Sequence, residues 1–421
     1  MFLKRWYIVA MVALVLVAKA NIGETADPTP SVPHPAPAAL EEVPVKEAVS
    51  VEEKTVSNEG IPYDSGTELT LKIGVPDLRP GFQFHAGLLL LQPSSDNLGY
   101  AVLTNVKNPA SPVPVASPFW EIQTLETSYQ PGFEVGTTYT FPDSGKDFQA
   151  DWQRLRTSNS SAVSAIDGLQ WVSPFSQTGP SSAESYDDLS DNQGVNLLRS
   201  ATGSVKYAYD AANFDFGQHV NVGSALDLRL FAGLSFARLQ EKIESSFYGA
   251  PPDPGAMFPA SVPLLISLNN TSTFTGVGPR FGFDTLYTTS GGLRLTGQLG
   301  AALLVGRTQP SQYLFAATSP ELALVGISNN QEQVSSTGFT QVVYSTNARL
   351  GIGFTHVFSG GNSFSLDAGY QATVYVDPFS GYETNHNVLP LQIGSLSTAS
   401  MRHKTSNFTA HGFYLSLTLQ W

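Results

Sequence analysis

The final segment of the chain, residues 408–421, alternates between apolar and polar side chains. One face carries Phe413, Leu415, Leu417, Leu419 and Trp421, and the other carries Gly412, Tyr414, Ser416, Thr418 and Gln420. A period of two predicts a β-strand with one apolar and one polar face. An apolar outer face that ends on an aromatic ring is typical of the closing strand of a membrane barrel. An edge strand of a soluble β-sandwich is the alternative.

The same alternation recurs from Phe82 onward, so the rest of the chain decides between these folds. Short turns rich in Gly, Asp and Asn alternate with long polar segments, and we place the turns at 142–146, 221–224, 288–292 and 359–362. Outer-membrane barrels have short periplasmic turns and long external loops, whereas a soluble domain rarely carries several loops this long. We therefore predict an all-β fold, a transmembrane antiparallel up-and-down β-barrel with long external loops.

The number of strands depends on the segment 120–129. A separate strand there would give an odd count and would put the two chain ends on opposite sides of the membrane. If Pro131 and Gly132 instead form a bulge inside one long strand, the count is even, about ten. We predict about ten strands with both ends in the periplasm. Twelve is the alternative if 262–268 or 388–396 forms another hairpin.

The N-terminal part differs in composition from the barrel, which we assign to residues 67–421. Residues 1–20 have a positively charged start, a short apolar core and an Ala-Lys-Ala cleavage site, which predicts a cleaved signal peptide. A retained anchor is the alternative. Residues 21–66 are rich in proline and lack an apolar period, so we predict a disordered periplasmic leader.

Composition supports a barrel with lipid outside and water inside. Charged residues make up 14% of the chain, below the ~25% of a typical soluble protein. The net charge of -13 argues against nucleic acid as a partner. The absence of cysteine excludes disulfides and thiolate chemistry.

Charged and amide residues gather on the polar phase of the predicted strands. A charge on the lipid face at mid-depth would cost ~2–4 kcal/mol, so we expect these residues to line the lumen: Asp227, Arg229, Arg280, Asp284, Arg294, Gln298, Asn347, Arg349, Asp367 and Gln371. Four arginines would bias a charged constriction toward anions. The alternative is an Arg–Asp network that fills and stiffens a narrow barrel, since small barrels have room only for side chains.

Signals of catalysis are weak. The chain has seven histidines, but no Gly-x-Ser-x-Gly elbow and no His-x-x-x-His spacing. We therefore predict no enzyme activity, no cofactor and no metal site.

Five short stretches carry a family resemblance in their order along the chain. They are Pro131-Gly132-Phe133 running to Tyr139-Thr140-Phe141, Leu230-Phe231-Ala232-Gly233-Leu234, Gly278-Pro279-Arg280-Phe281-Gly282, Leu303-Leu304-Val305-Gly306 and Asp367-Ala368-Gly369-Tyr370-Gln371. Together they resemble the Legionella-type major outer-membrane protein family of pore-forming barrels, over residues 67–421. The resemblance implies an outer-membrane location, pore formation and surface exposure, and it supplies no catalytic residues. The Pro-rich leader is not part of the family's pattern.

These observations predict a porin-like outer-membrane protein that is exported through its signal peptide and lets small solutes and ions diffuse passively. A surface adhesin, or a structural barrel with a closed lumen, is the alternative. The expected partners are the lipid bilayer, with Trp421 at its interface, and the barrel-assembly machinery through the C-terminal strand. A homo-oligomer, and surface ligands at the long loops, are further options that the sequence leaves open.

Overall fold

The computed structural model describes residues 73–75, 78–106, 116–166, 170–174, 198–223, 225–249, 265–289, 291–317, 330–359, 361–388 and 396–421. The predicted signal peptide (1–20) and Pro-rich leader (21–66) lie outside the described residues. Within the described part of the chain, no helix is long and apolar enough to cross a membrane.

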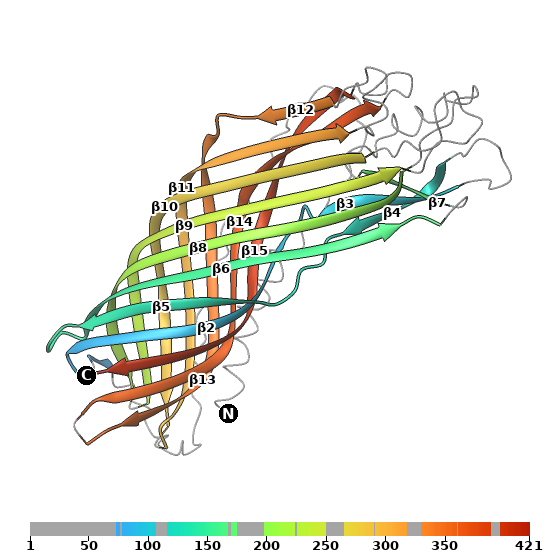
Figure 1. The fold of residues 1–421 in the computed structure, drawn as a ribbon. Helices are drawn as coiled ribbons and strands as arrows, with labels where there is room; N and C mark the ends of the chain where they lie inside the picture. The colour runs from blue at the N-terminus through green and yellow to red at the C-terminus, as the bar shows by residue number, and fades with distance from the viewer. Residues whose placement is uncertain are drawn as a thin grey trace, which may run out of the picture. The chain divides into compact units, whose positions relative to one another are not determined.

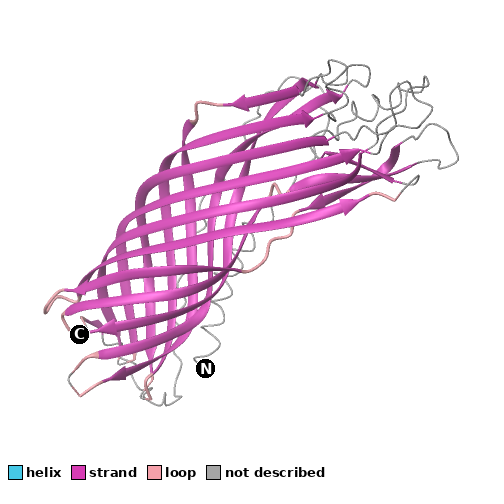
Figure 2. Ribbon diagram, in the orientation of Figure 1, coloured by secondary structure: helices cyan, strands magenta, loops and turns pink. Residues whose placement is uncertain are grey.

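Ten long strands form a closed antiparallel ring (Figures 1 and 2). In chain order they are β2 (Gly81–Ser95), β5 (Gln130–Thr140), β6 (Lys146–Ser164), β8 (Leu198–Val222), β9 (Leu226–Gly249), β10 (Leu265–Thr288), β11 (Leu293–Ala317), β13 (Phe339–Val357), β14 (Ser363–Val388) and β15 (Leu396–Gln420). The ring closes because β15 pairs with β14 on one side and with β2 on the other. The predicted antiparallel barrel of about ten strands is confirmed, and the alternative of twelve strands is wrong.

The number of strands is even, as predicted, but the predicted bulge at Pro131 and Gly132 is not the reason. Pro131 and Gly132 of β5 pair in unbroken register with β2, so there is no bulge between them. The preceding segment belongs to a separate three-stranded sheet of β3 (Gly99–Val106), β4 (Ala116–Thr124) and β7 (Gln170–Pro174). Of the two segments considered for an extra hairpin, residues 265–268, 388 and 396 are instead the far ends of β10, β14 and β15, and the other residues of these segments lie outside the described part of the chain.

The two ends of the barrel differ. One end, the turn end, carries the short connections β5–β6, β8–β9, β10–β11 and β13–β14 together with the C-terminus (Figure 1). The turns lie where the sequence predicts them. The other end, the loop end, carries the small sheet and β12 (Asn330–Ser335), which pairs with β11. The short β1 (Ile73–Gly74) pairs with β8 at the turn end.

An apolar band covers the outward face of the barrel from the turn end to about half the strand length. On β9 this face runs from Leu226 to Phe236, and the next outward residue is Arg238. That is about eleven residues, the length that a tilted strand needs to cross a bilayer. The band includes Trp421, which is 54% exposed and stacks on Phe84 at 5.2 Å between ring centroids.

Beyond the band the two faces exchange character. On β9, Leu239, Ile243 and Phe247 are buried inside the barrel, while Gln240 and Lys242 lie on the outward phase. Rings from three strands meet in this part of the lumen, with centroids 5.6–6.4 Å apart, and we call them the lumen plug: Tyr207, Tyr209, Tyr375, Phe379 and Phe408. The loop-end half is therefore packed like the core of a soluble protein. The observed strands are longer than the predicted ones. In their loop-end halves the apolar residues point inward and the polar residues outward, which is the reverse of the pattern used for the prediction.

Candidate functional site

Two connected polar spaces occupy the lumen at the level of the apolar band. The larger, the turn-end chamber, has a volume of about 300 Å³, and the smaller inner cavity next to the plug has about 50 Å³. Gln149, Gln298 and Arg349 line both spaces. The period of two places these side chains here, because the intervening residues of each strand point outward.

All ten residues predicted to line a pore border one of these two spaces. The chamber is lined by Asp227, Arg229, Asp284, Arg294, Gln298, Arg349 and Asp367, and the inner cavity by Arg280, Gln298, Asn347, Arg349 and Gln371. Their role in solute passage stays a prediction.

Arg229 is the centre of the ionic network near the turn end. Its Nε and Nη2 donate to the two oxygens of Asp147, both at 2.7 Å, and its Nη1 donates to Asp284 at 2.7 Å. His219 lies between Asp147 and Asp227, with its ring nitrogens 2.8 and 2.9 Å from their oxygens. Because a carboxylate only accepts, both ring nitrogens donate when both acids are ionised. The cluster ties β6, β8, β9 and β10 together.

The second ionic centre lies deeper, on β8, β9 and β10. Arg280 donates to Asp215 of β8 and reaches Asn347 of β13 at 3.4 Å. The Phe231 ring lies between two guanidinium groups, 4.7 Å from Arg280 and 5.3 Å from Arg229. Cation–π contacts of this kind hold the planes of both guanidinium groups.

Two further ion pairs join other strands of the ring. Arg349 of β13 donates to both oxygens of Glu134 of β5, at 3.0 and 2.7 Å, across the lumen. Its guanidinium carbon lies 4.0 Å from the centroid of the Tyr414 ring. Arg294 of β11 donates to Asp367 of β14 at 2.5 Å. Each of the four predicted lumen arginines thus contacts a carboxylate.

The predicted set omits several functional groups. Besides His219 and His85, the described membrane-level lumen contains four carboxylic acids that are not in it: Glu134, Asp147, Asp151 and Asp215. All lie on the polar phase of their strands, so the alternation was a usable signal for them. With them, carboxyl groups outnumber arginines seven to four in the described membrane-level lumen.

The comparisons with known proteins agree with an outer-membrane barrel. The family model described as Legionella pneumophila major outer membrane protein precursor matches residues 74–421. No curated protein matches the chain.

The chain matches solved structures of outer-membrane proteins at low identity and low TM-score. The outer membrane protease OmpT from Escherichia coli is 9% identical, with 84% of this chain and 99% of that chain covered and a TM-score of 0.36. A Pseudomonas aeruginosa FadL homologue is 10% identical, with coverages of 81% and 89% and a TM-score of 0.22. The Pseudomonas putida toluene transporter TodX is 6% identical, with coverages of 82% and 90% and a TM-score of 0.25. These values support no transfer of activity to this chain.

The family match, by contrast, extends over most of the sequence and over the whole strand ring. The protein is an outer-membrane β-barrel and belongs to the family of the Legionella pneumophila major outer membrane protein.

Proposed function

We propose that this barrel is a narrow diffusion pore for small polar solutes, with a preference for cations, and that its external end is closed in the present conformation. The observation that carries the proposal is the polar chamber of about 300 Å³ inside the membrane-level half of the barrel. In a barrel of this kind the short turns face the periplasm, so the turn-end chamber is the periplasmic vestibule.

The charge of the lumen supports a cation preference and speaks against the anion preference expected from the arginines alone. Every one of those arginines contacts a carboxylate, and seven carboxyl groups face four arginines. Even with His219 charged, the acids remain in excess. A ring of net negative charge in a low-dielectric wall raises the local concentration of cations.

The lumen plug favours a second candidate, a structural barrel with a closed lumen. Phe379 and Phe408 are 1% exposed and Tyr207 is 2% exposed, so their rings leave no water layer between them. If the protein is a diffusion pore, the plug must move out of the lumen for solutes to pass. If it is a structural barrel, the plug remains in the lumen.

Liposome swelling separates the two candidates. Vesicles containing the protein are diluted into iso-osmotic solutions of small solutes matched in size, one a cationic and one an anionic amino acid. We expect measurable swelling that is faster with the cationic solute, and none with a trisaccharide. Swelling that never exceeds that of empty vesicles would leave the structural barrel as the better account.

The proposal includes no catalysis. His219 and His85, the histidines of the chamber, lie against carboxylates that also bind arginines, which suits a structural network better than a general base. We further propose that residues 1–20 are removed on export, that 21–66 stay in the periplasm, and that β15 is the strand presented to the assembly machinery. N-terminal sequencing of the purified protein tests the first of these.

A further inference from the structure

The strand β14 leaves the barrel wall partway along its length. Its pairing with β13 ends at Ser345 and Tyr375, although β13 continues to Phe339 while paired with β11 on its other side. On β15, Tyr375 pairs with Phe408 and Phe379 with Ser406, so β14 carries two extra residues in a bulge. Asp377, within the bulge, has a φ of 54°, a left-handed conformation that aspartate tolerates better than most residues.

After the bulge, β14 runs across the inner face of the neighbouring strands. We call residues 379–388 of β14, together with the paired residues 396–406 of β15, the hairpin arm. The backbone N–H of Ser380 donates to Oγ of Ser272 on β10 at 2.9 Å. This contact skips both β13 and β11, so the arm lies inside the ring and not in its wall.

Side chains hold the pivot of the arm in place of a strand ladder. Nε2 of Gln341, from β13, donates to the carbonyl oxygens of Asp377 at 3.0 Å and Pro378 at 3.3 Å. On the opposite side the N–H of Asp377 donates to Oδ1 of Asn407 at 3.0 Å. A few such bonds are weaker than the continuous ladder that joins the rest of the wall.

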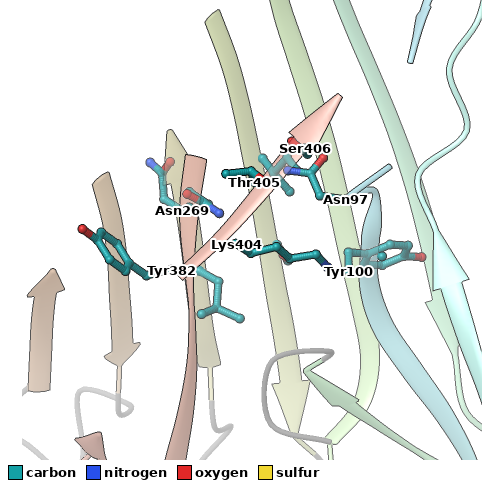
Figure 3. A pocket seen from close by; sticks show the side chains of 13 residues that line it. Asn97, Tyr100, Asn269, Tyr382, Lys404, Thr405 and Ser406 are labelled. Atoms are coloured by element: carbon teal, nitrogen blue, oxygen red, sulfur yellow. The ribbon is translucent and has the colours of Figure 1, made fainter. Parts of the chain in front are cut away.

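The arm supplies part of the plug that closes the lumen. Phe379 stands at its base and Phe408 directly beside it, and both contact the Tyr207 ring of β8. Between the arm and the opposite wall lies a cavity of about 90 Å³. Figure 3 shows its lining: Lys404 of the arm extends toward Tyr100, and Tyr382, Asn97 and Asn269 also border the cavity. There is thus free space next to the arm in the lumen.

We propose that the hairpin arm is the gate of the pore, with its pivot at residues 376–378. In the closed state the arm lies in the lumen and completes the plug. In the open state β14 straightens and pairs with the edge of β13 that is free from Phe339 to Tyr344, which withdraws Phe379 and the arm from the lumen. This inference rests on the proposed pore function, since a gate controls passage only where passage occurs.

Locking the arm tests the gate through conductance. The chain has no cysteine, so Ser272→Cys/Ser380→Cys places a single thiol pair between the arm and β10. Oxidation, verified by mass, should lower the open probability in planar bilayers about tenfold, and reduction should restore it. The matched control is Ser246→Cys/Ser267→Cys, a cross-strand pair whose hydroxyl oxygens are 3.4 Å apart on the outward phase. Its oxidation should leave conductance unchanged.

Thiol labelling tests the motion independently of conductance. Ser272 is 3% exposed beneath the arm, so a lone Ser272→Cys should react slowly with a membrane-impermeant maleimide, and faster when Gln341→Ala weakens the pivot. If Gln341→Ala speeds up the labelling but the protein does not conduct ions, the arm moves but the barrel is not a pore. No acceleration by Gln341→Ala, or full conductance with the arm cross-linked, would overturn the gate.

Discussion

The ionic side chains of the lumen connect different strands, and one ion pair crosses the ring. Glu134 is 3% exposed, and its two oxygens bind Arg349 from the opposite side of the ring. Removing one partner of a buried pair leaves the other charge without compensation, and this is more destabilising than the loss of an exposed pair. The arginines therefore support the cross-section of the barrel whether or not solutes pass.

Replacing Arg349 tests this structural role. Arg349→Met should lower the free energy of unfolding by about 3–5 kcal/mol, because Glu134 stays buried without its cation. Arg154→Ala, which removes an exposed arginine near Asp210 on the outer face, should cost less than about 1 kcal/mol. Urea midpoints in lipid vesicles measure both, and equal losses in the two variants would contradict the role.

Glu241 gives the loop-end half a pH dependence of unusual sign. It is 3% exposed and accepts hydrogen bonds from Ser95 at 2.6 Å and Asn97 at 2.7 Å. Burial raises the pKa of its carboxyl above the ordinary value, although these hydrogen bonds oppose the shift. As pH rises from the ordinary to the raised pKa, the unfolded state releases its proton first, so stability falls across that window.

The variant Glu241→Gln should remove this fall. At neutral pH it should be more stable than the parent protein, and at acid pH, where the parent carboxyl is protonated in both states, the two should be similar. Urea midpoints measured between about pH 4 and pH 8 provide the comparison. A Gln variant that loses stability at every pH would mean that the carboxylate itself is needed by its donors.

At the scale of the strands, the longest elements, such as β9, consist of two half-strands with opposite faces. On β9 the outward residues from Leu226 to Phe236 are apolar, and those from Arg238 onward are mainly polar. The first half meets lipid and the second meets water, so the same substitution should have different effects in the two halves.

Arginine substitutions on the outward face of β9 test the position of the band. Leu230→Arg puts a charge inside the band and should cost ~2–4 kcal/mol, whereas Gln240→Arg beyond the band should cost ~0–1 kcal/mol. Folding titrations in vesicles measure both. Equal costs would place the edge of the membrane elsewhere.

The sequence predicted the membrane halves of the strands because their alternation follows the rule of apolar out and polar in. It failed in the loop-end halves because residues such as Leu239 and Phe247 point inward there, so the pattern has the opposite sense. The alternation also does not predict the small sheet of β3, β4 and β7, because its strands are short and lie within segments expected to be loops or the continuation of a barrel strand. The pairing of Arg349 with Glu134, 215 residues apart, depends on ring closure and register, which local periodicity does not contain.

Under the proposed pore function, the lumen plug is the part of the barrel that limits passage most directly. Phe408 contacts four other rings, and Phe408→Ala should lower stability by about 3–5 kcal/mol. It should also raise conductance, since the removed ring leaves space in the lumen. Phe413→Ala, which removes an outward-facing ring that is 55% exposed, is the control that should leave conductance unchanged.

At the scale of the whole molecule, the barrel combines a membrane-level half with a wet, acidic interior and an external half with a dry core. The pivot of the hairpin arm lies at the border between the two halves, because β14 leaves the wall near the edge of the apolar band. Under the proposed pore function, this arrangement would separate the selection of ions from the closing of the lumen. The membrane-level lumen contains four arginines, but carboxyl groups outnumber them, so the interior is acidic.

The sign of the reversal potential across a planar bilayer with a KCl gradient tests this account most directly. We expect a potential that shows potassium passing more readily than chloride, and a shift toward chloride when Asp227→Asn and Asp284→Asn remove two chamber carboxylates. A preference for chloride in the parent protein would contradict the acidic lumen, and a membrane that stays insulating even with Phe408→Ala would contradict the pore.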